Sequence, residues 1–316
     1  MTNYIGVDVS KDSFDAHSTS LGSRKFSNDG TGFKLFRKWI GTSAHVVMEA
    51  SGPYYLRLAD DLYRSGFLVS VINPLVIRRF CQMNLQRAKT DRKDAEAIAQ
   101  FAQLTNPQAW SPAPEHVQQL LQMQSVMEQL SKQLTSTRNA LGSLNQHPNI
   151  YENALKSLRH VERAQQQQIA QLEKEIMELT KQHYQAELNS LVSIPGIGKK
   201  TAVLLILSTH GFSRFENIKQ LVAYTGIAPR IFQSGKTVNK KPKISKLGMA
   251  DLRRSLFMCA LTAIKNNLAC KNLFDRLRQK GRAAKVALMA VSHKLLRQAF
   301  ALAKSKEMFQ SELSLA

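Results

Sequence analysis

Cysteine is scarce in this chain, and its spacing fits neither a metal site nor a disulfide framework. Cys81, Cys259 and Cys270 form no CxxC pair and have no histidine pattern beside them. Zinc ribbons and small disulfide-stapled secreted domains are therefore excluded as classes. The three thiols suit a reducing cytoplasm.

Long hydrophobic runs are also missing. No apolar stretch reaches the roughly 18 residues that span a bilayer, and no charged region precedes an apolar one at the N-terminus. We therefore expect a soluble cytoplasmic protein without a membrane partner. A length of 316 residues predicts about two domains and at least one sizeable core.

Acidic residues are rare in the last part of the chain. Residues 191–316 hold 23 Lys or Arg against 5 Asp or Glu, which accounts for nearly all of the formal net charge of +21. A positive field concentrated in this way suits a polyanion, and nucleic acid is the usual one. The alternative is a basic surface that serves solubility alone.

Four carboxylates occur in local contexts where the burial of an acid requires a compensating interaction. Asp8 interrupts the apolar run YIGVDVSK, Glu49 interrupts HVVMEAS, and Asp91 and Asp94 lie three apart in KTDRKDAEAIAQF. An acid in a strand that is buried on both faces costs several kcal/mol unless it is paired or binds a cation. Residues three apart on a helix share one face. Acids from two strands and a helix therefore indicate a site for Mg²⁺, with room for two ions and with Mn²⁺ as a substitute.

Each of these acids also has a purely structural interpretation. Asp91 could cap a helix, Asp94 could pair with an adjacent basic residue, and Asp8 and Glu49 could serve turns. We favour the metal site because all four structural interpretations would have to hold together.

The first 112 residues alternate strand and helix patterns and predict an α/β layer. YIGVDVSK, DSFDAHSTS and SRKFSND form an expected β-meander with a turn at Gly22 and Ser23. A helix is expected from Thr31 to Ile40, HVVMEAS is expected as a buried strand, and FLVSVIN is expected as another apolar strand that Pro74 closes. Between those strands, the Ser-Gly-Pro sequence predicts a helix start.

Residues 113–189 have few aromatics and many glutamines, and they predict two long helices. The expected seam of a coiled coil includes Leu120, Met123, Met127, Leu130, Leu134, Thr137, Leu141 and Leu144. A turn at 145–148 predicts an antiparallel hairpin, although the same helices could pair between subunits or pack on a domain. Glu162 and Gln165 occupy seam positions and weaken the middle of the hairpin.

Residues 190–316 predict a basic, mostly helical domain. The turn in IPGIGKKTA resembles a helix-hairpin-helix turn, whose backbone N–H groups can bind a phosphate. Glycine pairs also cap ordinary helices, so this turn alone is only moderately specific. IFQSGKTVN predicts a small hairpin, which a basic loop connects to a helix. The residues expected to contact nucleic acid are Gly196, Gly198, Lys199, Lys200, Arg230, Lys236, Lys240, Lys241, Lys243 and Lys246.

Taken in order, GVDVSK, MEASGPY, KTDRKDAEAIA, IPGIGKKTA and LVAYTGIAPRIFQSGK resemble the transposases of the insertion sequence 110 family. The resemblance covers nearly the whole chain, and the ordered set is specific although no single piece is. In that family an RNase H-like, RuvC-like domain carries a DEDD tetrad, which maps onto Asp8, Glu49, Asp91 and Asp94. An essential serine in a Ser-Gly motif maps onto Ser234.

The resemblance implies an α/β plus α fold class. Its parts are an RNase H-like (RuvC-like) domain over 1–112, a coiled-coil insertion over 113–189 and a mostly helical transposase domain over 190–316. It implies DNA recombination in a bacterial cytoplasm, at the nucleoid, through a covalent bond between Ser234 and DNA. A structured noncoding guide RNA would pair with donor and target DNA, which would explain the lack of a base-reading helix.

Three interpretations follow from these residues. The first is the Mg²⁺-dependent, serine-dependent transposase, which we expect to be a homodimer or a tetramer. The second is a RuvC-like structure-specific endonuclease in which water attacks and Ser234 only forms a turn, as Ser-Gly often does. The third is a nucleic-acid-binding scaffold without enzymatic activity, whose acids bind a structural ion.

Overall fold

The computed structural model describes residues 3–85, 90–234, 238–245 and 247–310, with the backbone alone between 230 and 243. The chain divides into two compact units, Met1–Ala113 and Pro114–Ala316. Within the described ranges, no helix combines the length and the apolar character needed to cross a membrane.

A five-stranded mixed sheet forms the centre of the first unit. Its strands are β1 (Asn3–Val9), β2 (Ser13–Ser18), β3 (Gly22–Ser27), β4 (Ala44–Glu49) and β5 (Leu68–Ile72). They lie in the order β3-β2-β1-β4-β5, with β1 to β3 antiparallel and with β4 and β5 parallel to β1. The predicted meander, the buried strand β4 and the apolar strand β5 are confirmed, although β5 lies at the edge of the sheet and is only partly buried. The turn after β2 precedes Gly22, which already opens β3, so the predicted turn position was too late.

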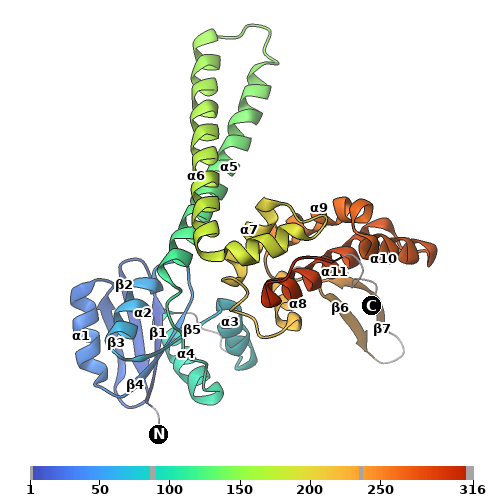
Figure 1. Ribbon diagram of the computed structural model, residues 1–316. Helices are drawn as coiled ribbons and strands as arrows, with labels where there is room; N and C mark the ends of the chain where they lie inside the picture. The colour runs from blue at the N-terminus through green and yellow to red at the C-terminus, as the bar shows by residue number, and fades with distance from the viewer. Residues whose placement is uncertain (1–2, 86–89, 235–237, 246, 311–316) are drawn as a thin grey trace. The chain divides into compact units, whose positions relative to one another are not determined.

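Helices cover both faces of this sheet (Figure 1). On one face, α1 (Gly30–Ile40) and α2 (Tyr55–Arg64) contribute to the larger hydrophobic core. On the other face, α3 (Pro74–Met83) and α4 (Asp91–Thr105) enclose a smaller one. The sequence predicted α1 and α2 but not α3, whose start is marked by the pair Asn73-Pro74. Asn73 Oδ1 accepts the Leu75 N–H at 2.9 Å, and proline in the first turn suits a helix start.

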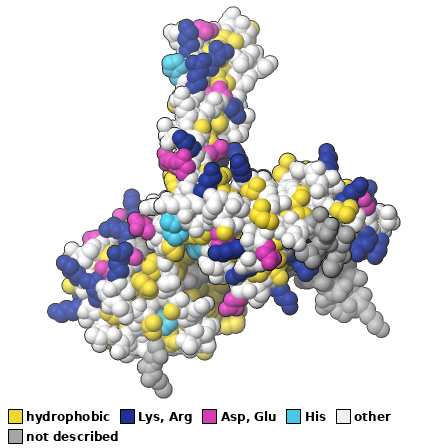
Figure 2. Space-filling view, viewed as in Figure 1, with side chains coloured by type: hydrophobic (Ala, Val, Ile, Leu, Met, Phe, Trp, Pro, Cys, Tyr) yellow, Lys and Arg dark blue, Asp and Glu magenta, His cyan; other side chains and the backbone are white. Residues whose placement is uncertain are grey.

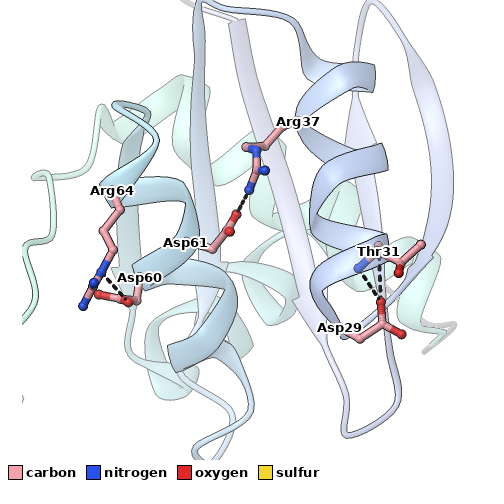
Figure 3. Close-up of polar contacts among 7 residues, drawn as sticks. Asp29, Thr31, Arg37, Asp60, Asp61 and Arg64 are labelled. Atoms are coloured by element: carbon pink, nitrogen blue, oxygen red, sulfur yellow. Dashed lines mark hydrogen bonds and ion pairs between the residues drawn. The ribbon is translucent and has the colours of Figure 1, made fainter.

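Polar contacts fix α1 and α2 at the surface of the first unit (Figure 3). Asp29 Oδ1 caps α1 by accepting the N–H groups of Thr31 at 2.9 Å and Gly32 at 2.8 Å. These N–H groups favour the charged carboxylate and so lower its pKa. Arg37 pairs with Asp61 and thereby links α1 to α2.

Two long helices open the second unit and pack against each other as an antiparallel hairpin (Figure 1). They are α5 (Glu115–Leu144) and α6 (Glu152–Ser193). Leu120 and Leu141 are buried, and the other expected seam residues of α5 are half-buried. Near their outer ends the two helices contact only each other, whereas Leu120 and Ile176 belong to the core of the unit. The hairpin is therefore partly embedded and partly free.

The middle of this hairpin is polar, as its sequence predicts. Glu162 lies at the seam and accepts a hydrogen bond from Arg138 Nε at 2.9 Å. Gln165 buries a side-chain oxygen that has no hydrogen-bond partner in the described part of the chain. Polar side chains at seam positions weaken a helical pair, so the outer end is held mainly by apolar contacts of its own, such as those of the buried Leu141 and Leu155.

The rest of the second unit is a helical core with one two-stranded ribbon. Its helices are α7 (Lys199–Thr209), α8 (Ile218–Thr225), α9 (Ala250–Asn266), α10 (Leu268–Gln279) and α11 (Ala284–Ser305). The ribbon pairs β6 (Pro229–Ser234) with β7 (Val238–Ile244) and confirms the predicted hairpin. Buried aliphatic residues of α7, α9 and α11 meet the base of α6 in one hydrophobic core.

Candidate active site

Asp8 and Glu49 are neighbours at one edge of the sheet. Val7 pairs with Met48 in the parallel ladder of β1 and β4, so the next residues along the strands, Asp8 and Glu49, lie opposite each other. Side chains two apart on a strand share a face, and Asp8 therefore projects on the same side as Gly6. Both strands end here, which opens this edge to α4.

Helix α4 lies directly on β1 because Gly6 has no side chain. A Cβ atom built on Gly6 would lie 2.1 Å from the carbonyl oxygen of Ala95 and 2.4 Å from the nitrogen of Ala99. At the start of the strand, the Tyr4 hydroxyl donates to Asn106 Oδ1 at 2.6 Å, just beyond the last turn of α4. The helix therefore runs antiparallel to β1, and its N-terminus faces the acidic end of the strand.

The first turn of α4 brings two more acids to this edge. Asp91 and Asp94 both lie in it, Asp91 exposed and Asp94 half-buried. Thr90 caps the helix, because its Oγ1 accepts the Lys93 N–H at 3.3 Å. The interpretation of Asp91 as the helix cap is therefore wrong, and its carboxylate remains available. The positive end of the helix dipole stabilises both charges.

Asp8 lies in the combined field of the other acids. Burial raises the pKa of its carboxyl group, and the charges of Asp94, Glu49 and Asp91 raise it further, from 3.8 to about 6. Asp15, which lies opposite Asp8 on β2, adds the smallest contribution. The other three predicted acids are all near enough for their charges to act on Asp8, so the four predicted acids lie at the same edge of the sheet. A bound cation relieves this kind of repulsion.

The carboxylates surround the edge without forming a closed coordination shell. Among the described residues, no three His, Cys, Asp or Glu side chains are arranged to hold a metal ion. This does not conflict with the raised pKa of Asp8, because charge acts over several Å whereas Mg²⁺ ligation needs oxygens at about 2.1 Å. The four acids are hard oxygen donors on converging backbone positions and fit Mg²⁺ or Mn²⁺ by their chemistry.

Three side chains beside this cluster were not predicted. Ser51 Oγ donates to Glu49 Oε1 at 2.8 Å and thereby fixes one carboxylate. Burial raises the pKa of the Cys81 thiol, and the charges of Asp94 and Glu49 raise it further. The third side chain is that of Asp15, which the antiparallel register of β1 and β2 places opposite Asp8. That register was the available signal for Asp15, and the position two residues after Glu49 was the available signal for Ser51.

Ser234 ends strand β6 at the tip of the ribbon in the second unit. Its backbone pairs with Val238 in the antiparallel register. Its side chain lies outside the described residues, as does Gly235. The structure therefore gives the position of the Ser234 backbone but not the position of its hydroxyl group.

The base of this ribbon is held by close contacts between backbones. Gly226 and Gly248 have φ of +68° and +111°, and a Cβ atom on Gly248 would lie 2.1 Å from the carbonyl oxygen of Tyr224. Arg253 Nη1 donates to the carbonyl oxygen of Thr225 at 2.8 Å. Only glycine tolerates such positive φ values together with so close a contact to a neighbouring backbone. The two segments that flank the ribbon are thus locked to each other.

The predicted phosphate-binding turn precedes α7. Gly196 has φ of +109°, and a Cβ atom there would lie 2.7 Å from the Cβ atom of Ala263. Gly198 is the N-cap residue and leaves the first N–H groups of α7 without a side-chain cap. Lys199 is exposed, but Lys200 Nζ lies 2.6 Å from Glu173 Oε1 on α6. This turn therefore offers free N–H groups and Lys199, while Lys200 also ties α7 to α6.

The remaining predicted nucleic-acid contacts belong to the ribbon and the loop after it. The backbones of Arg230, Lys240, Lys241 and Lys243 lie in β6 and β7, and their side chains lie outside the described residues. Lys236 and Lys246 lie wholly outside the described residues. These six contacts remain predictions.

Comparison with known proteins assigns the family. Residues 5–147 match the DEDD transposase family of the IS110 type, and residues 188–274 match a family described as "Transposase IS116/IS110/IS902 family". The pilin gene-inverting protein of Moraxella bovis is 31% identical over 98% of each chain. Transposases for the insertion sequence elements IS1328 of Yersinia enterocolitica and IS1111A of Coxiella burnetii are 26% and 25% identical, over 81% and 92% of this chain. The chain therefore belongs to the IS110 family of transposases, enzymes that cleave and rejoin DNA.

Proposed function

We propose that the edge formed by Asp8, Glu49, Asp91 and Asp94 is the metal-dependent catalytic centre of an RNase H-like domain. The observation that carries this proposal is the convergence of four acids from β1, β4 and α4 on one edge of a mixed sheet. Mg²⁺ bound there would polarise a phosphodiester and stabilise the developing charge on its oxygens. Ser51 would hold the Glu49 carboxylate in place.

We further propose that Ser234 is the nucleophile. Its Oγ would attack the phosphorus, so that an Oγ–P bond forms while the bond to a deoxyribose oxygen breaks. The serine proton passes to solvent, and the departing oxygen takes up a proton. Rejoining is the reverse reaction with the hydroxyl group of another strand. The ribbon base locked at Gly226 and Gly248 supports this role, because a nucleophile must be held in a defined position.

The proposal includes partners. The substrates are donor and target DNA, and a structured noncoding guide RNA supplies the sequence choice through base pairing. Insertion of an element, or inversion of a DNA segment as the name of the Moraxella relative indicates, are the two outcomes of such strand exchange. We expect a dimer or a tetramer that acts on the bacterial chromosome in the cytoplasm.

A covalent-adduct assay tests the nucleophile. Purified protein, Mg²⁺, co-expressed RNA and a nicked DNA substrate with a radioactive label should give a protein-DNA adduct that survives denaturing gel electrophoresis. Ser234→Ala should abolish the adduct and strand exchange while DNA binding persists. Ser213→Ala, at an exposed serine of the second unit outside the ribbon and its base, is the matched control and should retain the adduct.

The alternative is a structure-specific endonuclease in which water attacks. It predicts strand cleavage without any adduct, and cleavage that survives Ser234→Ala. Asp8→Asn should abolish cleavage under either mechanism, because both need the metal centre. Cleavage by the Ser234→Ala protein would therefore refute the serine mechanism but leave the proposal of an acidic metal centre intact. The chain belongs to a family of enzymes that cleave and rejoin DNA, and the interpretation as a non-enzymatic scaffold is therefore excluded.

A further inference from the structure

The charges of the α5–α6 hairpin are separated along its length. In its outer part, residues 130–165, five Lys or Arg stand against two Glu. In its inner part, residues 115–129 and 166–189, two Lys stand against six Glu. The hairpin as a whole is nearly neutral, so this separation becomes apparent only when the two helices are paired. Figure 2 shows Lys and Arg side chains gathered toward the outer end.

Three cations of the outer part form one stripe on α6. Lys156, Arg159 and Arg163 are spaced by three and four residues, which places them on one face of the helix. All three are exposed, and within the described ranges none has an acidic partner. The nearby Glu162 is engaged by Arg138 at 2.9 Å. We call Lys156, Arg159 and Arg163 the outer stripe.

The outer stripe brings no benefit to the folded hairpin. Like charges spaced by three or four residues destabilise a helix by about 0.2–0.5 kcal/mol per pair. A solvated helix face would carry mixed charges, as the inner part of α6 does with Lys174 and Glu178. The stripe is therefore explained better by an anionic partner than by folding.

We propose that the outer stripe binds the phosphate backbone of duplex DNA. Seven residues of helix extend about 10 Å, and a duplex strand offers a phosphate about every 3.4 Å of its axis, so the stripe can follow a straight backbone. No Phe, Tyr or Trp occurs between Glu152 and Gln165, and His160 is the one aromatic ring in this segment, so the stripe offers little surface on which unpaired bases could stack. This inference rests on the DNA chemistry of the proposed function and adds a contact remote from the ribbon.

Salt-dependent binding tests this inference. The anisotropy of a fluorescent 30-bp duplex is titrated with the full chain between 50 and 300 mM salt. Arg159→Gln with Arg163→Gln should weaken binding about five- to thirtyfold and reduce the slope of log K against log salt by about 1.8. Lys174→Gln with Lys181→Gln removes the same charge from the inner part of α6. This control should keep the slope and stay within about twofold of the wild type.

The outcomes separate this inference from the proposed function. An unchanged slope in the outer-stripe variant, or an equal loss in the inner control, overturns the stripe assignment. If the outer-stripe variant loses affinity for a hairpin RNA probe but not for the duplex, the assignment of duplex DNA as the ligand is overturned. Failure of the wild type to bind DNA counts against the proposed function instead. Circular dichroism should show unchanged or slightly greater helix content in the outer-stripe variant, which excludes unfolding as the cause of weaker binding.

Discussion

Gly6→Ala is expected to destabilise the first unit and to displace two of the four acids. The added Cβ atom would lie 2.1 Å from the Ala95 carbonyl oxygen and 2.4 Å from the Ala99 nitrogen, well inside the 3.0 Å that real Cβ atoms keep. Overfilling a close contact usually costs about 1–3 kcal/mol, and here the upper end applies because backbone cannot change rotamer. With a urea m-value of roughly 1.5 kcal/mol/M, the midpoint should fall by about 2 M.

Tryptophan fluorescence measures this change in the intact chain. Both tryptophans, Trp39 and Trp110, belong to the first unit and contact its larger core, so their emission follows the unfolding of this unit alone. Gly30→Ala is the matched control, because a Cβ atom there meets nothing within 4 Å and its φ is not in the left-handed region. The control should stay within about 1 kcal/mol of the wild type.

A second variant separates backbone contact from side-chain crowding. Ala99→Gly removes a methyl group from α4 but keeps the nitrogen and Cα atoms that the new Cβ would meet. It should therefore fail to rescue Gly6→Ala, and the double variant should be no more stable and no more active in DNA cleavage than Gly6→Ala alone. A Gly6→Ala protein with a wild-type midpoint and wild-type cleavage would refute the claim that this contact aligns Asp91 and Asp94 with Asp8.

Three further outcomes are expected. The contribution of His45 to the unfolding free energy should fall as pH drops below about 6.5, because burial lowers the pKa of His45 and the unfolded state therefore binds the proton more readily. The raised pKa of Asp8 acts in the opposite direction, so the contribution is measured as the difference between the wild type and His45→Asn in fluorescence-monitored urea titrations at each pH. Ser51→Ala should slow cleavage about tenfold without changing the thermal midpoint, because Glu49 loses a hydrogen bond of 2.8 Å. Gly248→Ala should impair adduct formation more than DNA binding, whereas Gly281→Ala, also at positive φ but with open space around it, should leave the adduct intact.

The sequence predicted the location of the acids well because strand ends and helix starts are local features. Asp8 and Glu49 interrupt apolar strands, and Asp91 opens a helix after a threonine cap, all of which short windows reveal. The interpretation of Asp91 as the cap was wrong because threonine and aspartate are both good caps, and only the backbone distinguishes them. Helix α3 was not predicted because the pair Asn73-Pro74 is also typical of a turn that ends a strand.

Contacts between distant residues could not be predicted from the sequence. The close approach of Gly6 to Ala95 joins residues that are far apart along the chain, and no local pattern encodes it. Lys200 was assigned to nucleic acid because of its neighbours, whereas its ion pair with Glu173 depends on how α7 meets α6. The separation of charge in the α5–α6 hairpin likewise depends on which residues the turn places side by side.

The antiparallel course of α4 on β1 bears on how the enzyme can be tagged. The acids lie at the far end of β1, and Asn3 begins that strand five residues before Asp8. At about 3.3 Å per residue this is a separation of about 17 Å. An affinity handle or fluorescent reporter fused ahead of Asn3 would be attached at the end of the strand remote from the proposed metal centre, so labelled enzyme should remain fit for single-molecule recombination experiments.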